Sequence, residues 1–151
     1  MSTTTAAFSP IPSYLLGALC LALGLNSILR PSNEYPRFGL PFESGPVGAN
    51  ARKVKPSKPT QPTGANDACV SPLIHLKGIR ETSYGLALIA LQYQGQDVAV
   101  TTIAAICALA GLGDGVVVWK YGEEELRVKK ALGHWMAFLG FGGWALWRVY
   151  W

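Results

Sequence analysis

The sequence predicts an all-α integral membrane protein built as a four-helix bundle. Half of the 151 residues are hydrophobic, and only 15% are charged. The charged residues are concentrated between four apolar stretches, each close to the roughly 20 helical residues that cover a hydrocarbon core of about 30 Å. Because the bilayer offers no water to backbone groups, such stretches cross it as helices. The stretches are residues 11–29, 70–91, 98–119 and 131–150.

The length suits one domain, residues 1–151, with all four helices in the same membrane unit. A soluble helical bundle is the alternative interpretation. Soluble bundles carry a wide polar face on each surface helix, however, and these stretches have little room for one.

The first stretch, 11–29, is expected to be a retained helix, because residues 1–12 lack the basic residues of a signal peptide. Seven prolines follow within 31–69. Proline removes a backbone donor and fixes φ, so we expect an extended, polar loop there.

The later stretches carry typical helix signals. Pro72 suits the first turn of the helix at 70–91, and Asp97 is a good N-cap for the helix at 98–119. That third helix has small residues four apart, which lets membrane helices approach closely. The fourth helix ends in an aromatic belt typical of a membrane interface. The small pairs are Ala104 with Ala108 and Gly111 with Gly115, and the belt is Trp144, Trp147, Tyr150 and Trp151.

Basic residues predict the topology. Of the thirteen Lys and Arg, six lie between Arg30 and Lys58 and four between Lys120 and Lys130, while only Arg148 lies near the C-terminus. The positive-inside rule then places both long loops in the cytosol and both termini on the far side. The predicted partner is the lipid bilayer, of an endomembrane such as the endoplasmic reticulum, and not nucleic acid. The three cysteines have no metal-ligand spacing, so we expect no metal and no cofactor.

Charged residues inside the second and third helices are the most informative feature. Lys77, Arg80 and Glu81 lie in one apolar stretch and Asp114 in the next. An ionisable group in hydrocarbon costs about 2.5–3.5 kcal/mol on insertion scales, so each needs a partner or a wet cavity. Lys77 and Glu81 are four residues apart on one face, and Asp114 is available to Arg80 across the helix interface.

The predicted topology brings the polar residues of all four helices to one leaflet, as a cytosol-facing pocket would, and leaves the far half almost purely apolar. The candidate catalytic residues are Arg80, Glu81, Asp114, His75 and His134. The candidate substrate-binding residues are Lys77, Tyr84 and Asn26. The competing interpretation is a structural ion pair between Arg80 and Asp114 that joins two helices, because structural pairs perturb ionisation as functional ones do.

Three short motifs carry a resemblance. They are Lys77-Gly-Ile-Arg-Glu81 with the following Tyr84-Gly-Leu-Ala-Leu88, then Gly113-Asp-Gly-Val-Val-Val118, and Phe38-Gly-Leu-Pro41. In these motifs the chain resembles an uncharacterised family of small four-helix membrane proteins from fungi and bacteria, filed as a domain of unknown function. The basic, proline-rich insert at 43–66 departs from the compact loop that the resemblance implies.

Fungal members of that family often lie in secondary-metabolite gene clusters, so the resemblance implies a role in polyketide or terpenoid biosynthesis. We therefore expect an accessory protein of such a pathway, as a cofactor-free cyclase or isomerase for a lipophilic small molecule. Arg80 would polarise an oxygen, Asp114 or Glu81 would move a proton, and a histidine would relay it. The alternative is a non-catalytic scaffold, assembly factor or transport accessory that binds other membrane biosynthetic enzymes.

Overall fold

The computed structural model describes residues 8–41 and 71–151, and these residues form helices and no strand. The helices are α1 (Ile11–Leu29), α2 (Pro31–Phe38), α3 (Pro72–Tyr93), α4 (Asp97–Tyr121) and α5 (Arg127–Tyr150). The four long helices confirm the four predicted stretches, with α1 at the predicted bounds and the others shifted or extended by up to four residues. The basic stretch at 52–58, the insert at 43–66 and Cys69 lie outside the described residues.

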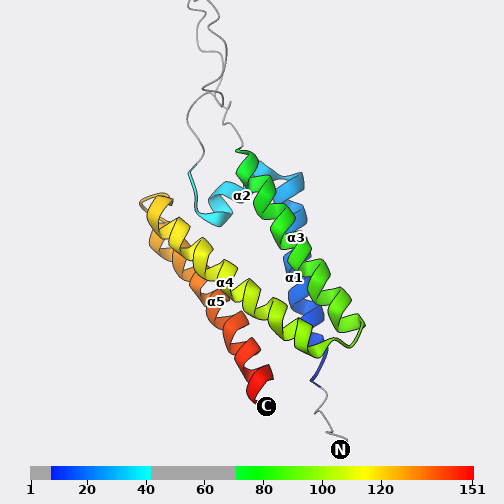
Figure 1. The fold of residues 1–151 in the computed structure, drawn as a ribbon. Coiled ribbons are helices and arrows are strands. Elements are labelled where there is room, and N and C mark those ends of the chain that lie inside the picture. The colour runs from blue at the N-terminus through cyan, green and yellow to red at the C-terminus, as the bar shows by residue number, and fades with distance from the viewer. Residues whose placement is uncertain (1–7, 42–70) are drawn as a thin grey trace, which may run out of the picture.

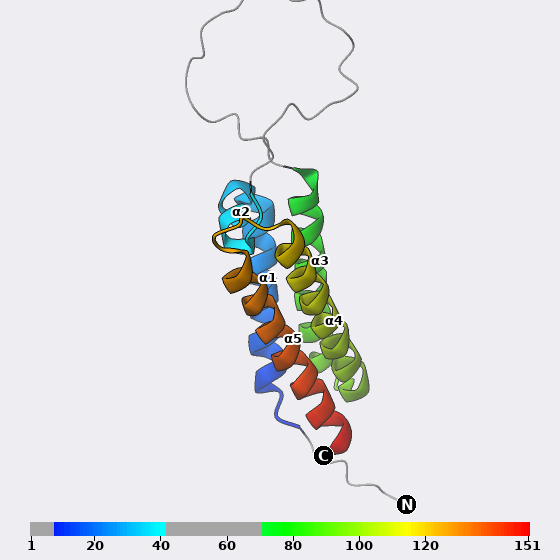
Figure 2. The same cartoon turned by 90° about the vertical axis from the view of Figure 1, so that its left-hand side faces the viewer.

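The long helices form two antiparallel pairs, α1 with α3 and α4 with α5 (Figure 1). The α3–α4 contact joins the pairs and is lighter than the contacts within them. In Figure 2 the chain alternates direction from helix to helix, so α1 begins and α5 ends at the same end of the bundle. We call this the terminal end, and the opposite end, where α2 lies, the loop end.

Glycines let the backbones of α1 and α3 touch. A Cβ atom on Gly24 would lie 2.5 Å from the Thr82 amide nitrogen and 2.7 Å from the Gly78 carbonyl oxygen. A Cβ on Gly85 would lie 2.6 Å from the carbonyl oxygen of Gly17. Close approach through small residues is how helices associate in membranes. The closest approach of two helix backbones is therefore in α1–α3 and not in α4, the small-residue helix that the sequence singled out.

That helix, α4, does use its predicted small residues. Ala104 and Ala108 are buried, and Gly111 and Gly115 face α5. A Cβ on Gly111 would lie 3.2 Å from the His134 carbonyl oxygen, and one on Gly115 would overlap the indole of Trp135. The small residues thus set the spacing within both helix pairs.

The expectation of an extended loop throughout 31–69 was wrong at its start, because residues 31–38 form the helix α2. Pro31 lies in the first turn, where the missing amide proton costs nothing. Gly39 ends α2 with φ +101°, a left-handed conformation that favours glycine. A Cβ there would also lie 2.7 Å from the Cβ of Lys130. The Phe38-Gly-Leu-Pro41 motif is therefore a helix end.

Helix α2 lies between the two helix pairs at the loop end (Figures 1 and 2). Phe38 packs in a small core with Val118 of α4 and Ala131 of α5. The Lys130 ammonium donates to the Arg37 carbonyl oxygen over 3.2 Å. The Ser71 amide, just before α3, donates to the Tyr35 hydroxyl over 2.6 Å. Helix α2 thereby lies between the two pairs and contacts both of them.

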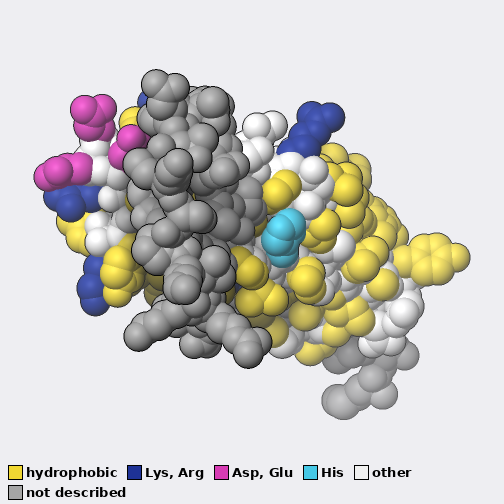
Figure 3. Space-filling model, turned by 90° about the horizontal axis from the view of Figure 1, so that it is seen from above, with side chains coloured by type: hydrophobic (Ala, Val, Ile, Leu, Met, Phe, Trp, Pro, Cys, Tyr) yellow, Lys and Arg dark blue, Asp and Glu magenta, His cyan; other side chains and the backbone are white. Residues whose placement is uncertain are grey.

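Small residues lie at many helix contacts inside the bundle, and large aliphatic side chains lie on its outer surface. Gly17, Ser27, Ala104 and Ala131 are among its buried residues, whereas long aliphatic side chains on every long helix are exposed. Among the latter are Leu15, Leu76, Ile79, Leu109, Leu132, Leu139 and Leu146, each more than half exposed. Seen from the loop end, hydrophobic side chains cover much of one flank, and acidic and basic side chains gather at the rim (Figure 3). By length and composition, α1 and α4 are each able to cross a membrane.

Candidate functional site

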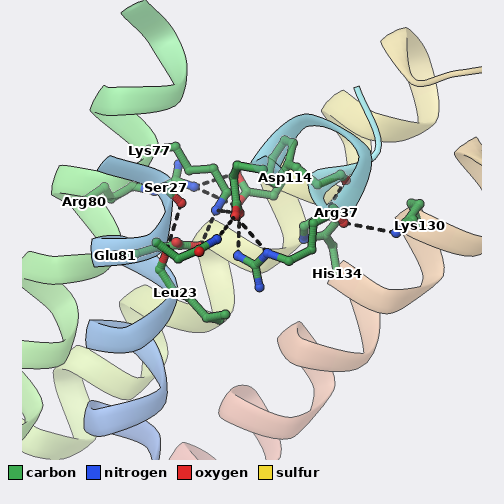
Figure 4. A network of polar contacts seen from close by, with 12 residues as sticks. Leu23, Ser27, Arg37, Lys77, Arg80, Glu81, Asp114, Lys130 and His134 are labelled. Carbon is green, nitrogen blue, oxygen red and sulfur yellow. Dashed lines mark hydrogen bonds and ion pairs between the residues drawn. The ribbon is translucent and has the colours of Figure 1, made fainter. Parts of the chain in front are cut away.

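Glu34 of α2 is the centre of a buried ion network, and its cations Arg37 and Lys77 are labelled in Figure 4. Its side chain is fully buried. Arg37 donates to both Glu34 carboxylate oxygens, the Lys77 ammonium to Oε1 over 2.9 Å, and the Asn26 amide to Oε2 over 3.1 Å. The network therefore binds α2 to α1 and α3 through charge-assisted hydrogen bonds.

Burial and hydrogen bonding act on Glu34 in opposite directions. Burial alone would raise the pKa of its carboxyl. The hydrogen bonds from Arg37 and Lys77, together with the charges of both cations, outweigh burial and hold the pKa below its ordinary value near 4.5. Glu34 is thus a carboxylate at neutral pH.

Both ion pairs predicted from the sequence are present. The Lys77 ammonium donates to Glu81 Oε1 over 2.7 Å along α3. Arg80 binds Asp114 across the α3–α4 interface, but through one nitrogen, Nη2, at 2.8 Å and 2.6 Å from the two carboxylate oxygens. Only one guanidinium nitrogen makes this pair, so the other N–H groups of Arg80 do not bind Asp114.

These charges border a cavity of about 210 Å³ between the two helix pairs, which we call the inner cavity. Its loop end is charged, and Leu19, Ala137 and Phe141 form an apolar wall, in which Leu19 and Ala137 are exposed. Helix α2 contributes Glu34, Arg37 and Phe38. The remaining lining residues are Cys20, Leu23, Lys77, Arg80, Glu81, Tyr84, Cys107, Ala110, Gly111, Asp114 and His134.

Two buried polar atoms on this lining have no hydrogen-bond partner among the described residues. They are the Arg80 Nε, a donor, and the Glu81 Oε2, an acceptor. An unsatisfied buried polar atom costs about 1–3 kcal/mol. Both side chains line the inner cavity, so a rotation of each would turn its unpaired atom toward an oxygen-bearing molecule there.

A second cavity, of about 460 Å³, lies on the other side of the Arg80–Asp114 pair, and we call it the outer chamber. It shares Phe38, Lys77, Arg80 and Asp114 with the inner cavity. Its other walls are mainly apolar: Tyr35, Leu40, Ser71, Leu73, Ile74, Leu76 and Val117. The ion pair is therefore part of the wall between the two spaces.

The structure brings most predicted site residues together. Arg80, Glu81, Asp114, His134, Lys77 and Tyr84 all line the inner cavity. The His134 Nε2 lies 3.1 Å from the Phe38 carbonyl oxygen, which anchors its ring to α2. Asn26 does not line the cavity but holds Glu34, and His75 does not line it at all. The roles assigned to these residues stay predictions.

The sequence interpretation missed Glu34 and Arg37, because both fall in the segment read as an extended loop. A signal was present: an acidic and a basic residue three apart directly after Pro31 are typical of a short helix with complemented ends. Pro36 within the same turns obscured that signal.

The expectation of an almost purely apolar far half was also wrong. At the terminal end, Arg148 donates to the Asp97 carboxylate over 2.8 Å and to the Thr101 hydroxyl over 2.9 Å. Asp97 was predicted as an N-cap but instead begins α4 and pairs with Arg148. The guanidinium also lies over the rings of Phe8 and Trp144. We call this group the Arg148 clamp.

The family model for a domain of unknown function, DUF4267, matches residues 17–148. This range includes all five helices in whole or in large part and the whole inner cavity. No curated protein and no solved structure matches the chain. The match carries nothing about gene clusters or metabolites, so the expected link to polyketide or terpenoid biosynthesis stays a prediction.

Proposed function

This chain belongs to the DUF4267 family, and we propose that it is a multi-pass membrane protein whose inner cavity binds a lipophilic molecule. In the proposal α1, α3, α4 and α5 all cross the bilayer, and the loop end faces the cytosol. The cavity carries out a cofactor-free proton transfer on the bound molecule, as an isomerase or cyclase does.

Four crossings are supported by the inside-out distribution of side-chain size. Small residues fill the helix contacts, and long aliphatic side chains point outward on α3 and α5 as on α1 and α4. Helices α3 and α5 are less apolar along their length than α1 and α4, the two described helices able to span by length and composition alone. Their charges Lys77 and Arg148 are buried against partners, which lowers the cost of insertion.

The observation that carries the proposed chemistry is an unpaired donor and an unpaired acceptor on two side chains that line one cavity. The Arg80 guanidinium is held by Asp114 yet keeps Nε–H free, and Glu81 is held by Lys77 yet keeps Oε2 free. A cation fixed beside a carboxylate with an open oxygen is suited to moving a proton next to a polarised oxygen.

The proposed step is an enolisation. Arg80 Nε–H binds the oxygen of the substrate, and Glu81 Oε2 removes a proton from the adjacent carbon. The electron pair moves to the oxygen, where the guanidinium stabilises the developing charge. On a β,γ-unsaturated carbonyl the enolate is a dienolate, and Glu81 returns the proton to the γ carbon, which moves the C=C bond from the β,γ to the α,β position without oxidant or reductant.

Metabolite profiling tests this proposal. A strain that lacks the protein is complemented with the wild type, Arg80→Met, Glu81→Gln or, as a control outside the cavity, Glu124→Gln. One defined precursor should accumulate in the deletion, Arg80→Met and Glu81→Gln strains and disappear with wild type and Glu124→Gln at equal protein abundance. Unchanged profiles in both cavity variants contradict the chemistry.

A non-catalytic scaffold is the second candidate, and the carboxylate pairing favours it. Glu34, Glu81 and Asp114 each touch at least one cation, as expected of a structural network. In that case the deletion lowers all products together, and the cavity variants act only through protein abundance.

A further inference from the structure

The structure assigns a substrate class to the inner cavity: an uncharged, long-chain molecule whose oxygen-bearing head lies in the inner cavity and whose tail lies in the outer chamber. We propose this on the premise that the inner cavity is a binding site. Three observations support it: the charges that line the inner cavity balance, Arg80 and Glu81 each have an unpaired atom, and the two spaces share a wall.

Charge balance predicts a neutral head. The inner cavity is lined by three cations, Arg37, Lys77 and Arg80, and by three carboxylates, Glu34, Glu81 and Asp114. Each is already in an ion pair (Figure 4). A charged head would enter this half-buried space without a free counter-charge, which is costly in a low-dielectric site.

The free hydrogen-bonding atoms predict the kind of head. Arg80 offers one unpaired donor and Glu81 one unpaired acceptor. A hydroxyl group both donates and accepts, so one hydroxyl satisfies both atoms, whereas an enolisable carbonyl, the substrate of the proposed step, accepts from Arg80 and donates to Glu81 only as its enol. An ether or ester oxygen satisfies only the donor.

The two spaces predict where the tail lies. The inner cavity, at about 210 Å³, is smaller than the roughly 300–1,000 Å³ of pockets that hold a drug-sized ligand. The outer chamber, at about 460 Å³, begins behind the Arg80–Asp114 pair. Its walls Leu73, Leu76 and Val117 are 67%, 60% and 42% exposed, so they face the space that lipid would fill.

The Arg80–Asp114 pair then acts as a gate between head and tail. One Arg80 nitrogen makes both contacts with Asp114, so a small rotation of the guanidinium opens the wall that the two spaces share. A ligand entering sideways between α3 and α4, where the packing is lighter than within the pairs, meets this wall first.

Photolabelling of the full chain in phosphatidylcholine nanodiscs tests the inference. The probe is dodecanol with a diazirine in its tail and an alkyne for detection. Ala137→Trp fills the inner cavity and Val117→Trp fills the outer chamber. Val116→Trp is the matched control, because Val116 is 51% exposed and does not line either space. We expect both filling variants to lower labelling by about tenfold and the control to retain it.

Competition tests the head group in the same experiment. Unlabelled dodecanol should displace the probe, and dodecyl sulfate and dodecyltrimethylammonium at sub-solubilising concentrations should not. Equal displacement by either ion overturns the neutral head.

The variants separate this inference from its premise. If Ala137→Trp alone abolishes labelling, the tail position is wrong while the inner cavity remains a binding site. If Val117→Trp alone does so, or no variant has an effect, both the inference and the proposed binding site fall.

Discussion

The two ends of the bundle bury charge in different ways. At the terminal end, Arg148 is 1% exposed and is enclosed by Asp97, Thr101 and two aromatic rings. Its Nη1 also has no hydrogen-bond partner, but none of the cavities described above is lined by Arg148. At the loop end, the unpaired atoms of Arg80 and Glu81 are buried too, but both side chains line the inner cavity. At the terminal end, hydrogen bonds and ring contacts offset the cost of burying the Arg148 charge. At the loop end, Arg80 and Glu81 each keep an unpaired atom with which a ligand can form a hydrogen bond.

The largest expected effect is at the loop end. Glu34→Ala removes the α2 partner of buried Lys77, which keeps Glu81, together with the partner of Arg37, and we expect a loss of about 3 kcal/mol in the free energy of unfolding. Chemical unfolding of the purified protein in detergent micelles measures it. Glu124→Ala, at an exposed carboxylate, is the control and should lie within about 0.5 kcal/mol of wild type. Equal losses in the two variants would mean that the Glu34 network does not hold α2.

The Arg148 clamp should matter for stability alone. Arg148→Ala removes hydrogen bonds to a carboxylate and a hydroxyl, so we expect a loss of about 1.5–3 kcal/mol. Photolabelling of the inner cavity at a temperature where the variant is folded should match wild type. Lower labelling in this folded variant would join the two ends in one site and break the comparison.

A charge swap separates stapling from chemistry. Arg80→Asp and Asp114→Arg should each destabilise the protein, and the double variant should recover about 0.5–3 kcal/mol of coupling energy. The proposed chemistry needs the guanidinium on α3, so the double variant should regain stability without regaining product. Recovery of both would favour the structural staple.

The smallest expected effect is a pH dependence from Glu34. Its folded-state pKa lies below its ordinary value near 4.5, so its contribution to stability is complete above that value. The contribution is lost as the pH falls through the depressed folded pKa. Unfolding curves between neutral pH and strong acid should therefore show a loss that Glu34→Gln lacks. A Glu34→Gln curve with the full acid loss would assign that loss to other carboxyls.

The four long helices could be predicted from the sequence because hydrophobic length sets them. The bounds of α1 agreed, and the pairs Lys77–Glu81 and Arg80–Asp114 followed from i,i+4 spacing and from antiparallel depth. The helix bounds and the two ion pairs both depend on the regular geometry of a helix, which can be worked out from residue spacing alone.

Helix α2 and the Arg148 clamp could not be found by the same reasoning. The number of prolines led us to predict one extended loop over 31–69. Pro31, however, suits the first turn of a helix, and Gly39 suits a helix end. Asp97 lies at the start of α4 and Arg148 near the end of α5. They become partners because the antiparallel packing of these helices brings both residues to the terminal end. The outer chamber depends on how far apart α3 and α4 pack, which side-chain volumes decide.

The most direct test of the loop-end site is to identify the small molecule that copurifies with the protein. Wild type, Ala137→Trp and Met136→Trp are purified from their own host in mild detergent, and the extracts are compared by mass spectrometry. Met136 is the neighbouring exposed residue and does not line the inner cavity. We predict one uncharged, oxygen-bearing lipophile in wild type and Met136→Trp and its loss in Ala137→Trp. The same lipophile in all three would contradict a binding site at the loop end.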